Sequence, residues 1–337
     1  MLLLHGGGYS ALTWSLMAAE LIRLCNCRIV GLDLRGHGET KLVGEKLGDT
    51  PDMAGEMLER DVEQVVAALA EPGPLILVGH SMGGALAARI ASGDPGLPGL
   101  AGLVVVDVVE GTALEALASM HTVLQARPRQ FAGLGQAVEW AVRSGQVRNA
   151  ESARVSMPGQ LVNEAGTPAS QICEEDVTEE SSEAEEATAA RAPRPVGTDS
   201  ISEEGEADQE EAEFRRPGPV HPPEPPQTLS GKESYRWRID LARTETHWAG
   251  WFQGLSARFL AGPSAKLLLL AGVDRLDREL TVGQMQGKFQ LQVLPRVGHT
   301  VHEDSPDRVA EVIASFLVRN KLCIASDNFS TPTMPGC

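Results

Sequence analysis

The sequence predicts an α/β fold in which a mostly parallel sheet is covered by helices on both faces. Short, continuously apolar runs alternate with longer stretches that have helical periodicity, which is typical of strands buried on both sides. Glycine-rich turns follow two of these runs directly. Turns of that kind commonly lie at the carboxyl edge of a parallel sheet, where ligands and catalytic groups gather.

Six apolar runs are the predicted strands, at residues 2–5, 28–34, 75–79, 103–108, 266–272 and 289–295. Helices are predicted between most of them, including 55–71 and 305–321, because apolar residues recur there at helical spacing. The interval 109–260 interrupts the alternation. Its stretches at 113–125, 134–146 and 236–260 are interpreted as helices of a cap over the strand ends. Trp237, Trp248 and Trp251 fall in the last stretch, where core packing is favoured over a role as a substrate-groove wall.

The chain divides by composition into a core interrupted by a cap and an insertion. Of the formal net charge of −17, residues 171–214 account for −14, with sixteen Asp or Glu and two Arg. Few large apolar side chains and much like charge predict disorder there, and a proline-rich linker follows. The favoured interpretation is a solvated spacer, and an acidic docking arm for a basic surface is the alternative. The predicted parts are core 1–108, helical cap 109–163, disordered insertion 164–232, cap helix 233–262, core 263–322 and C-terminal tail 323–337.

Several protein classes are disfavoured by composition. No run of eighteen apolar residues could span a membrane, and the opening residues lack the basic segment and length of a signal peptide. The five cysteines form no C-x-x-C pair, which favours a reducing, intracellular compartment. We therefore expect a cytoplasmic protein, with the nucleus as a second compartment, and neither nucleic acid nor membrane as a partner.

The motif LVGHSMGGA, residues 78–86, places Ser81 between a predicted strand and a predicted helix. Glycines at 79 and 83 complete G-x-S-x-G, the nucleophile elbow, in which a sharp turn presents the serine hydroxyl. The pattern also occurs by chance in loops, so a purely structural turn is the alternative. The strand before it and the helix after it favour a nucleophile.

A nucleophilic serine needs a base, and "PRVGHTVHED" offers His299 and His302. His299 is favoured because its loop follows the last strand directly, where a hydrolase histidine would reach Ser81. For the orienting acid, Asp107 and Asp274 both end strands, and position alone leans towards Asp274. Both alternatives stay open at this point.

An oxyanion would be held by backbone amides. The glycine-rich run at residues 5–8 follows the first strand and resembles an HGGG loop, so the amide of Gly7 is one candidate donor and that of Met82 the other. Phosphate binding is disfavoured, because neither G-x-x-x-x-G-K-[ST] nor G-x-G-x-x-G is present. The second glycine-rich turn, 33–40, is interpreted as structural. Ester chemistry of this kind requires neither a metal nor an organic cofactor.

Longer stretches, among them LLLHGGGYSALTW, CRIVGLDLRGHGETK, VVDVVEGTALEAL, WRIDLARTETHWAGWF and GHTVHEDSPDRVAE, resemble the protein phosphatase methylesterases. The resemblance covers most of the chain outside the insertion. It implies an α/β-hydrolase fold and removal of the methyl ester from the C-terminal leucine of the protein phosphatase 2A catalytic subunit, the implied partner. It also implies Ser81 as nucleophile, His299 as base and Asp107, in DVVEG, as the acid.

The same resemblance implies that members have an N-terminal portion with two further strands, so we expect this sequence to lack them. Two rival functions remain. A general small-ester hydrolase would carry every one of these residues, and an inactive form would act only as a phosphatase-binding module.

Overall fold

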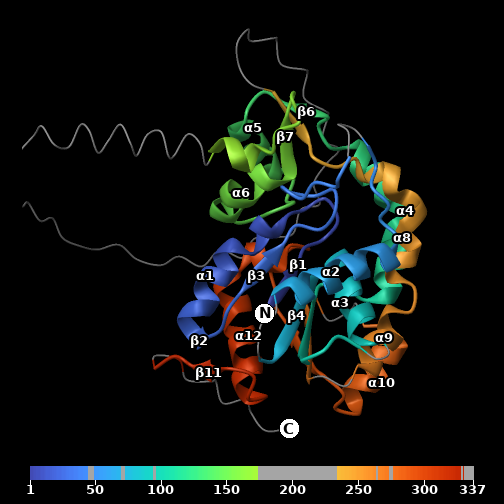
Figure 1. The fold of residues 1–337 in the computed structure, drawn as a ribbon, viewed down its shortest axis with the longest axis vertical. Coiled ribbons are helices and arrows are strands. Elements are labelled where there is room, and N and C mark those ends of the chain that lie inside the picture. The colour runs from blue at the N-terminus through green and yellow to red at the C-terminus, as the bar shows by residue number, and fades with distance from the viewer. Residues whose placement is uncertain are drawn as a thin grey trace, which may run out of the picture. The chain divides into compact units, whose positions relative to one another are not determined.

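A six-stranded, wholly parallel sheet organises the chain, with strand order β10-β9-β5-β4-β1-β3 (Figure 1). The computed structural model describes residues 1–44, 49–69, 73–93, 96–173, 234–262, 265–272, 276–327 and 329. The strands are β1 Leu2–Leu4, β3 Val30–Leu32, β4 Leu75–His80, β5 Leu100–Val106, β9 Ala265–Leu270 and β10 Gln290–Val293. The predicted parallel α/β fold is confirmed.

Alternate side chains of the strands enter two separate cores. Leu2 and Leu4 face one core, whereas Leu3 between them faces the other, as the two-residue period of a strand requires. Both faces are covered, so the strands need no polar side, and this explains their continuously apolar sequences.

Helices from distant parts of the chain cover the two faces (Figure 1). One face packs against α1 and α12, the other against α2, α3, α8 and α9. The bounds are η1 Ala11–Trp14, α1 Ser15–Leu24, α2 Gly55–Leu69, α3 Met82–Ala91, α8 Glu245–Phe252, α9 Leu255–Ala261, α10 Arg278–Met285, α11 Val301–Asp304 and α12 Pro306–Arg319. Two short strands, β2 Cys25–Asn26 and β11 Ile324–Ala325, pair antiparallel beside this body.

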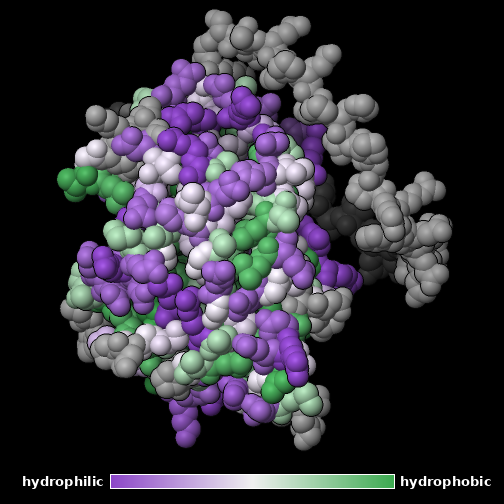
Figure 2. Space-filling model, turned by 90° about the vertical axis from the view of Figure 1, so that its right-hand side faces the viewer, coloured by the Kyte–Doolittle hydropathy of each residue, from purple (hydrophilic) through white to green (hydrophobic). Residues whose placement is uncertain are grey.

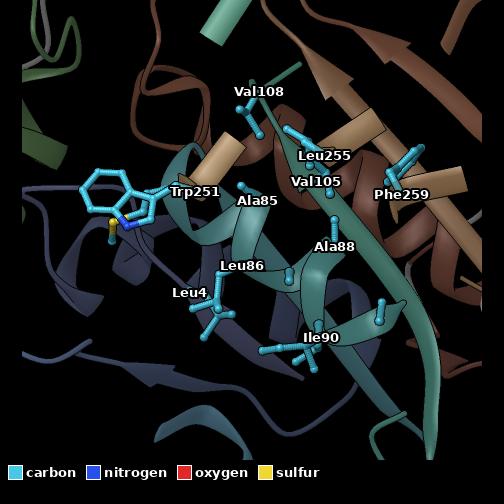
Figure 3. Close-up of a cluster of buried hydrophobic side chains, with 14 of the residues drawn as sticks. Leu4, Ala85, Leu86, Ala88, Ile90, Val105, Val108, Trp251, Leu255 and Phe259 are labelled. Carbon is cyan, nitrogen blue, oxygen red and sulfur yellow. The ribbon is translucent and has the colours of Figure 1, made fainter. Parts of the chain in front are cut away.

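Helix α3 is the most buried helix and is built of small residues. Ala85 and Ala88 belong to the buried cluster that also contains Val105 of the sheet and Phe259 of α9, as Figure 3 shows. Small side chains allow the helix backbone to approach the strands closely. This close packing fixes the start of α3, where the elbow serine lies.

The cap differs from the predicted set of helices. After α4 (Glu110–Gln125) it contains a three-stranded antiparallel sheet, β6-β8-β7, with its own small apolar core. Its elements are β6 Gln130–Phe131, α5 Leu134–Arg143, α6 Ala150–Ser156, η2 Met157–Gln160, β7 Leu161–Asn163, β8 Tyr235–Trp237 and η3 Leu241–Thr244. The prediction of a helix from residue 236 was therefore wrong at its start. Tyr235, Trp237 and Ile239 alternate with arginines, which is the two-residue period of a strand.

Two further predictions need correction, the start of the insertion and the placement of two tryptophans. Residues 164–173 were assigned to the insertion, yet Ala169 is buried in the cap core and Asn163 bonds the Thr167 amide at 2.9 Å. The rest of the predicted insertion, from residue 174 to 232, lies outside the described residues. Trp248 and Trp251 pack in the main core beside the sheet rather than inside the cap.

The face formed beside α4, α8 and α10 is largely polar, and its apolar residues lie in areas interrupted by polar ones (Figure 2). Exposed apolar side chains such as Val123 and Met285 belong to the helices of this side. Single exposed apolar residues are normal on a protein surface.

Candidate active site

Ser81 stands in a strained turn between β4 and α3. Its φ of 51° and ψ of −119° are rare for a residue with a side chain. The flanking glycines make the turn possible. A Cβ at Gly79 would lie 2.1 Å from the Gly83 carbonyl oxygen, and one at Gly83 would lie 2.3 Å from the Leu4 oxygen. The sequence motif thus has the strand–turn–helix geometry of a nucleophile elbow.

The elbow lies where the strand order reverses. β1 is hydrogen-bonded to β3 on one side and to β4 on the other, so the loops that follow β1 and β4 leave the sheet in opposite directions. In open α/β sheets the crevice at such a switch point is the usual ligand site. The loop after β1 carries Gly7, and the turn after β4 carries Ser81.

The two residues that carry the candidate oxyanion donors are neighbours in space. A Cβ on Gly7 would be 3.7 Å from Met82 Sδ, and Met82 is the first residue of α3, where amide groups have no partner inside the helix. The next amide, that of Gly8, donates instead to His37 Nε2 at 2.9 Å. His5 Nε2 accepts from the Leu34 amide at 3.0 Å. The second glycine-rich turn, which contains His37, therefore supports the first, in line with its structural interpretation.

Asp107 and His299 form a direct pair. Asp107 Oδ2 is 2.8 Å from His299 Nδ1, and its Oδ1 accepts from the Ala271 amide at 2.9 Å. The Asp107 side chain is fully buried, whereas that of His299 is 48% exposed. A buried carboxylate on Nδ1 leaves Nε2 of the imidazole free to accept a proton. The Ser81 hydroxyl makes no hydrogen bond to any described residue, and such contacts often tighten only when substrate binds.

The alternative base is His302, and the alternative acid is Asp274. His302 is 1% exposed and stacks on Trp14 at 4.0 Å between ring centroids, away from Asp107. Among the described residues, neither of its ring nitrogens has a hydrogen-bond partner. Asp274 lies outside the described residues.

The cap holds the loop that carries His299. Thr300 Oγ1 donates to the Gln146 carbonyl at 2.8 Å, and Ser152 Oγ donates to the Glu303 carbonyl at 2.7 Å. From the core side, the His80 ring bonds the His299 carbonyl through Nε2 at 2.9 Å. The histidine therefore stands on a loop restrained from two directions, which fixes its position relative to Asp107.

Sequence reasoning missed a group of buried histidines behind this site. Burial lowers the pKa of His5 to about 4 and of His37 and His302 to about 3. Burial, followed by neighbouring His299 and His302, holds the pKa of His80 well below its usual range. All four side chains are therefore neutral at pH 7. Such histidines act here as hydrogen-bonding and packing groups rather than as cations.

Sequence reasoning also missed the cap residues beside the glycine-rich loop. Leu241 lies over it, because a Cβ on Gly7 would be 3.6 Å from Leu241 Cδ2. Arg127 Nη1 lies 3.7 Å from the position of a Cβ on Gly8. Leu241 is thus the nearest side chain to both glycines, and at Gly8 the cationic group of Arg127 lies just beyond it. Arg127 belongs to none of the stretches quoted above, and Leu241 lies in WRIDLARTETHWAGWF without a role assigned to it there.

The comparisons with known proteins agree with this geometry. Residues 1–312 match the alpha/beta hydrolase family. The chain is 47% identical over 343 residues to "Protein phosphatase methylesterase 1" of Mus musculus, which covers 100% of this chain and 80% of that protein. The chain belongs to the protein phosphatase methylesterase family. The Homo sapiens methylesterase gives the same identity and coverage, and the "Probable protein phosphatase methylesterase 1" of Caenorhabditis elegans is 39% identical over 99% of this chain and 72% of its own length.

Solved structures support the fold of the methylesterase family. E-2-(acetamidomethylene)succinate hydrolase has a TM-score of 0.60 at 17% identity, covering 94% of this chain and 91% of its own. A peroxisomal alpha-beta-hydrolase from Saccharomyces cerevisiae has a TM-score of 0.59 at 14% identity, covering 99% and 80%. The predicted α/β-hydrolase fold and the predicted class of serine esterase are both confirmed. In the part of the chain that the structure describes, no helix has the length and apolar character needed to cross a membrane.

Proposed function

We propose that this methylesterase removes the methyl ester from the C-terminal leucine of the protein phosphatase 2A catalytic subunit, with Ser81, His299 and Asp107 as its triad. The names of its relatives support a phosphatase as substrate. The observation that carries the triad is the 2.8 Å contact of His299 Nδ1 with a fully buried Asp107, at the edge of the sheet where the Ser81 elbow lies.

In the first half of the reaction, His299 Nε2 takes the proton of the Ser81 hydroxyl as the oxygen attacks the ester carbonyl. Asp107 stabilises the imidazolium that forms, and the amides of Gly7 and Met82 donate to the oxyanion. Collapse of this intermediate breaks the carbonyl–methoxy bond. His299 returns its proton to the leaving oxygen, so methanol departs and an acyl-enzyme remains.

In the second half, His299 removes a proton from water as the water oxygen attacks the acyl-enzyme. The bond to Ser81 then breaks, Ser81 regains its proton, and a C-terminal carboxylate is released. The half-exposed side chain of His299 suits a substrate that is presented at the end of another protein's chain. The expected compartments of action are the cytoplasm and the nucleus.

Methanol release from methylated phosphatase 2A tests the proposal. We expect turnover by the wild-type chain and a loss of roughly 10³-fold or more in Ser81→Ala. Rapid hydrolysis of small esters with no turnover of the methylated phosphatase would favour a general esterase. Phosphatase binding without hydrolysis of either substrate would favour the binding module.

A further inference from the structure

Arg127 places a cation beside the loop that carries the candidate oxyanion donor. It follows α4 by two residues, and its Nη1 lies 3.7 Å from where a Cβ on Gly8 would stand. Gly8 is adjacent in sequence to Gly7. The guanidinium therefore lies near the residue that follows the candidate donor, and Leu241 Cδ1 lies closer still, at 2.7 Å from the same Cβ position.

This cation is held in place by an aromatic platform. Arg127 Cζ is 5.1 Å from the centroid of the Trp237 ring, and the Trp237 indole N–H donates to the Pro128 carbonyl at 2.8 Å. Phe131 and Trp140 pack edge-on against the same ring, at 5.5 and 5.4 Å between centroids. Stacking uses the face of a guanidinium and leaves its N–H groups free in the plane.

Arg127 differs from Arg35 and Arg89 of the main core, because no described residue forms an ion pair with it. Arg35 forms a two-fold ion pair with Asp61, and Arg89 pairs with Glu56 and Glu59. Burial lowers the pKa of Arg127, and the Tyr9 phenol is the neighbour that opposes this effect. A guanidinium still keeps its proton. A partly buried charge with no paired carboxylate among the described residues therefore lies beside the glycine-rich loop, and this is costly unless an anion binds it.

We infer that Arg127 binds a carboxylate of the phosphatase chain in the active site, in addition to the ester group. This inference rests on the proposed function. A planar guanidinium fork matches a carboxylate with two parallel hydrogen bonds. That carboxylate can belong to an acidic side chain near the ester or to the C-terminal carboxylate that hydrolysis creates. The first source makes Arg127 a specificity residue and the second makes it a product-binding residue.

Binding measurements separate the two sources. On the Ser81→Ala background, which leaves the ester intact, we would titrate leucine-terminated peptides by calorimetry as methyl ester and as free acid. Each form would be prepared with an aspartate near its end and with asparagine in its place. The same titrations on Arg127→Gln, Arg127→Lys and Arg129→Gln complete the set. Arg129→Gln is the matched control. Arg129 is exposed and lies two residues from Arg127, and its replacement removes the same charge.

The expected result is a loss of about tenfold to a hundredfold in affinity for the carboxylate-bearing peptide in Arg127→Gln. Arg127→Lys should recover part of it, and Arg129→Gln should lose less than about twofold. If the carboxylate is an acidic side chain, Arg127→Gln should lose affinity for the peptides with aspartate, both as methyl ester and as free acid. A terminal carboxylate as the source predicts that the loss is confined to the free acids.

Equal losses for all four peptides, or no loss beyond that of Arg129→Gln, would overturn the inference. Circular dichroism and thermal unfolding of each variant show whether an equal loss comes from misfolding, and Arg127→Lys provides a second, less disruptive variant. The measurement does not depend on turnover. If the wild-type chain failed to release methanol, the proposed function would fail while the carboxylate affinities still decided the role of Arg127.

Discussion

Asp107 Oδ2 lies 2.8 Å from His299 Nδ1, although the two residues are 192 positions apart in the chain. Asp107 follows β5, next to the serine-bearing β4, and its backbone has a positive φ of 49°. That unusual conformation accompanies the carboxylate's two contacts, with His299 and with the Ala271 amide. The imidazole is thereby held with its Nδ1 towards Asp107, which leaves Nε2 on the opposite side of the ring for proton transfer.

Replacing Asp107 by asparagine tests this relationship. An amide of the same shape should keep the fold but favour the wrong imidazole tautomer, with a loss of about 10⁴-fold in kcat. Asp274→Asn should cost about tenfold at most. Both variants would be assayed on one ester substrate, with circular dichroism to confirm folding. A larger loss at Asp274 than at Asp107 would reverse the assignment of the acid.

Ser81 should be the single serine that reacts with a fluorophosphonate probe. Ser81→Ala should abolish labelling and reduce turnover by roughly 10³-fold or more, because the members of a triad act as a unit. Gel fluorescence and methanol release measure the two effects. Labelling that persists in the alanine variant would refute Ser81 as the nucleophile.

The tight turn at the elbow should tolerate no side chain at Gly83. A methyl group there would meet the Leu4 carbonyl oxygen at 2.3 Å, and backbone cannot move aside cheaply, so Gly83→Ala should destabilise the fold by about 1–3 kcal/mol. Gly135→Ala in α5 is the control, since nothing lies within 4 Å of its Cβ position. It should be neutral or slightly stabilising. Urea unfolding of both variants gives the comparison, and equal stabilities would contradict the close approach.

The buried histidines should make the fold sensitive to acid. His5, His37, His80 and His302 have lowered pKa values in the folded state, so the unfolded chain binds more protons than the folded one below pH 6.5. The free energy of unfolding should therefore fall as the pH drops from about 6.5 towards 3, by up to about 1.4 kcal/mol per pH unit for each histidine.

His302→Phe should make this dependence shallower, because it removes one proton site and keeps a ring against Trp14. His121→Gln, which replaces a half-exposed histidine beside Glu245, is the control for the loss of a histidine that is not buried. Unfolding in urea at several pH values provides the measurement. Identical slopes in the wild type and His302→Phe would show that His302 is not neutral and buried.

Glu303 should act in the opposite direction. Burial raises the pKa of its carboxyl to about 8, so the folded state keeps a proton that the unfolded state releases above about pH 4.5. Its contribution to stability is present below that pH and is lost as the pH rises through 8. Glu303→Gln cannot ionise and should gain stability over the wild type as the pH rises from 5 to 8. Exposed Glu311→Gln is the control, and a gain that does not grow with pH would contradict a neutral Glu303.

The sequence carried strong local signals for the sheet and for Ser81. Apolar runs such as Leu75–His80 are continuous because both faces of the sheet are buried. The G-x-S-x-G turn depends only on residues within five positions. Both features can therefore be predicted from neighbouring residues. His299 was favoured because its loop follows the last strand. Asp107 needed the family resemblance, since position alone leaned to Asp274.

The cap and its residues could not be predicted in the same way. The guanidinium of Arg127 is defined by Trp237, which lies 110 residues further along, and by Gly8 near the start of the chain. Contacts between residues so far apart in the chain produce no regular pattern in the sequence. The strand at Tyr235–Trp237 is different. Its aromatic residues alternate with arginines, which indicates a strand, but the helical pattern that follows in the sequence obscures this signal.

The pairing of Asn163 with Tyr235 in the cap sheet has a consequence for how this chain can vary. The chain after Asn163 first turns back into the cap core at Ala169, so both strands are held by the cap itself, and the length of chain between residues 173 and 234 does not affect their geometry. The entropy of closing such a loop grows only with the logarithm of its length. Segments of very different size can therefore occupy this position. New chain ends created between these residues should likewise allow two fragments to reassemble into one hydrolase.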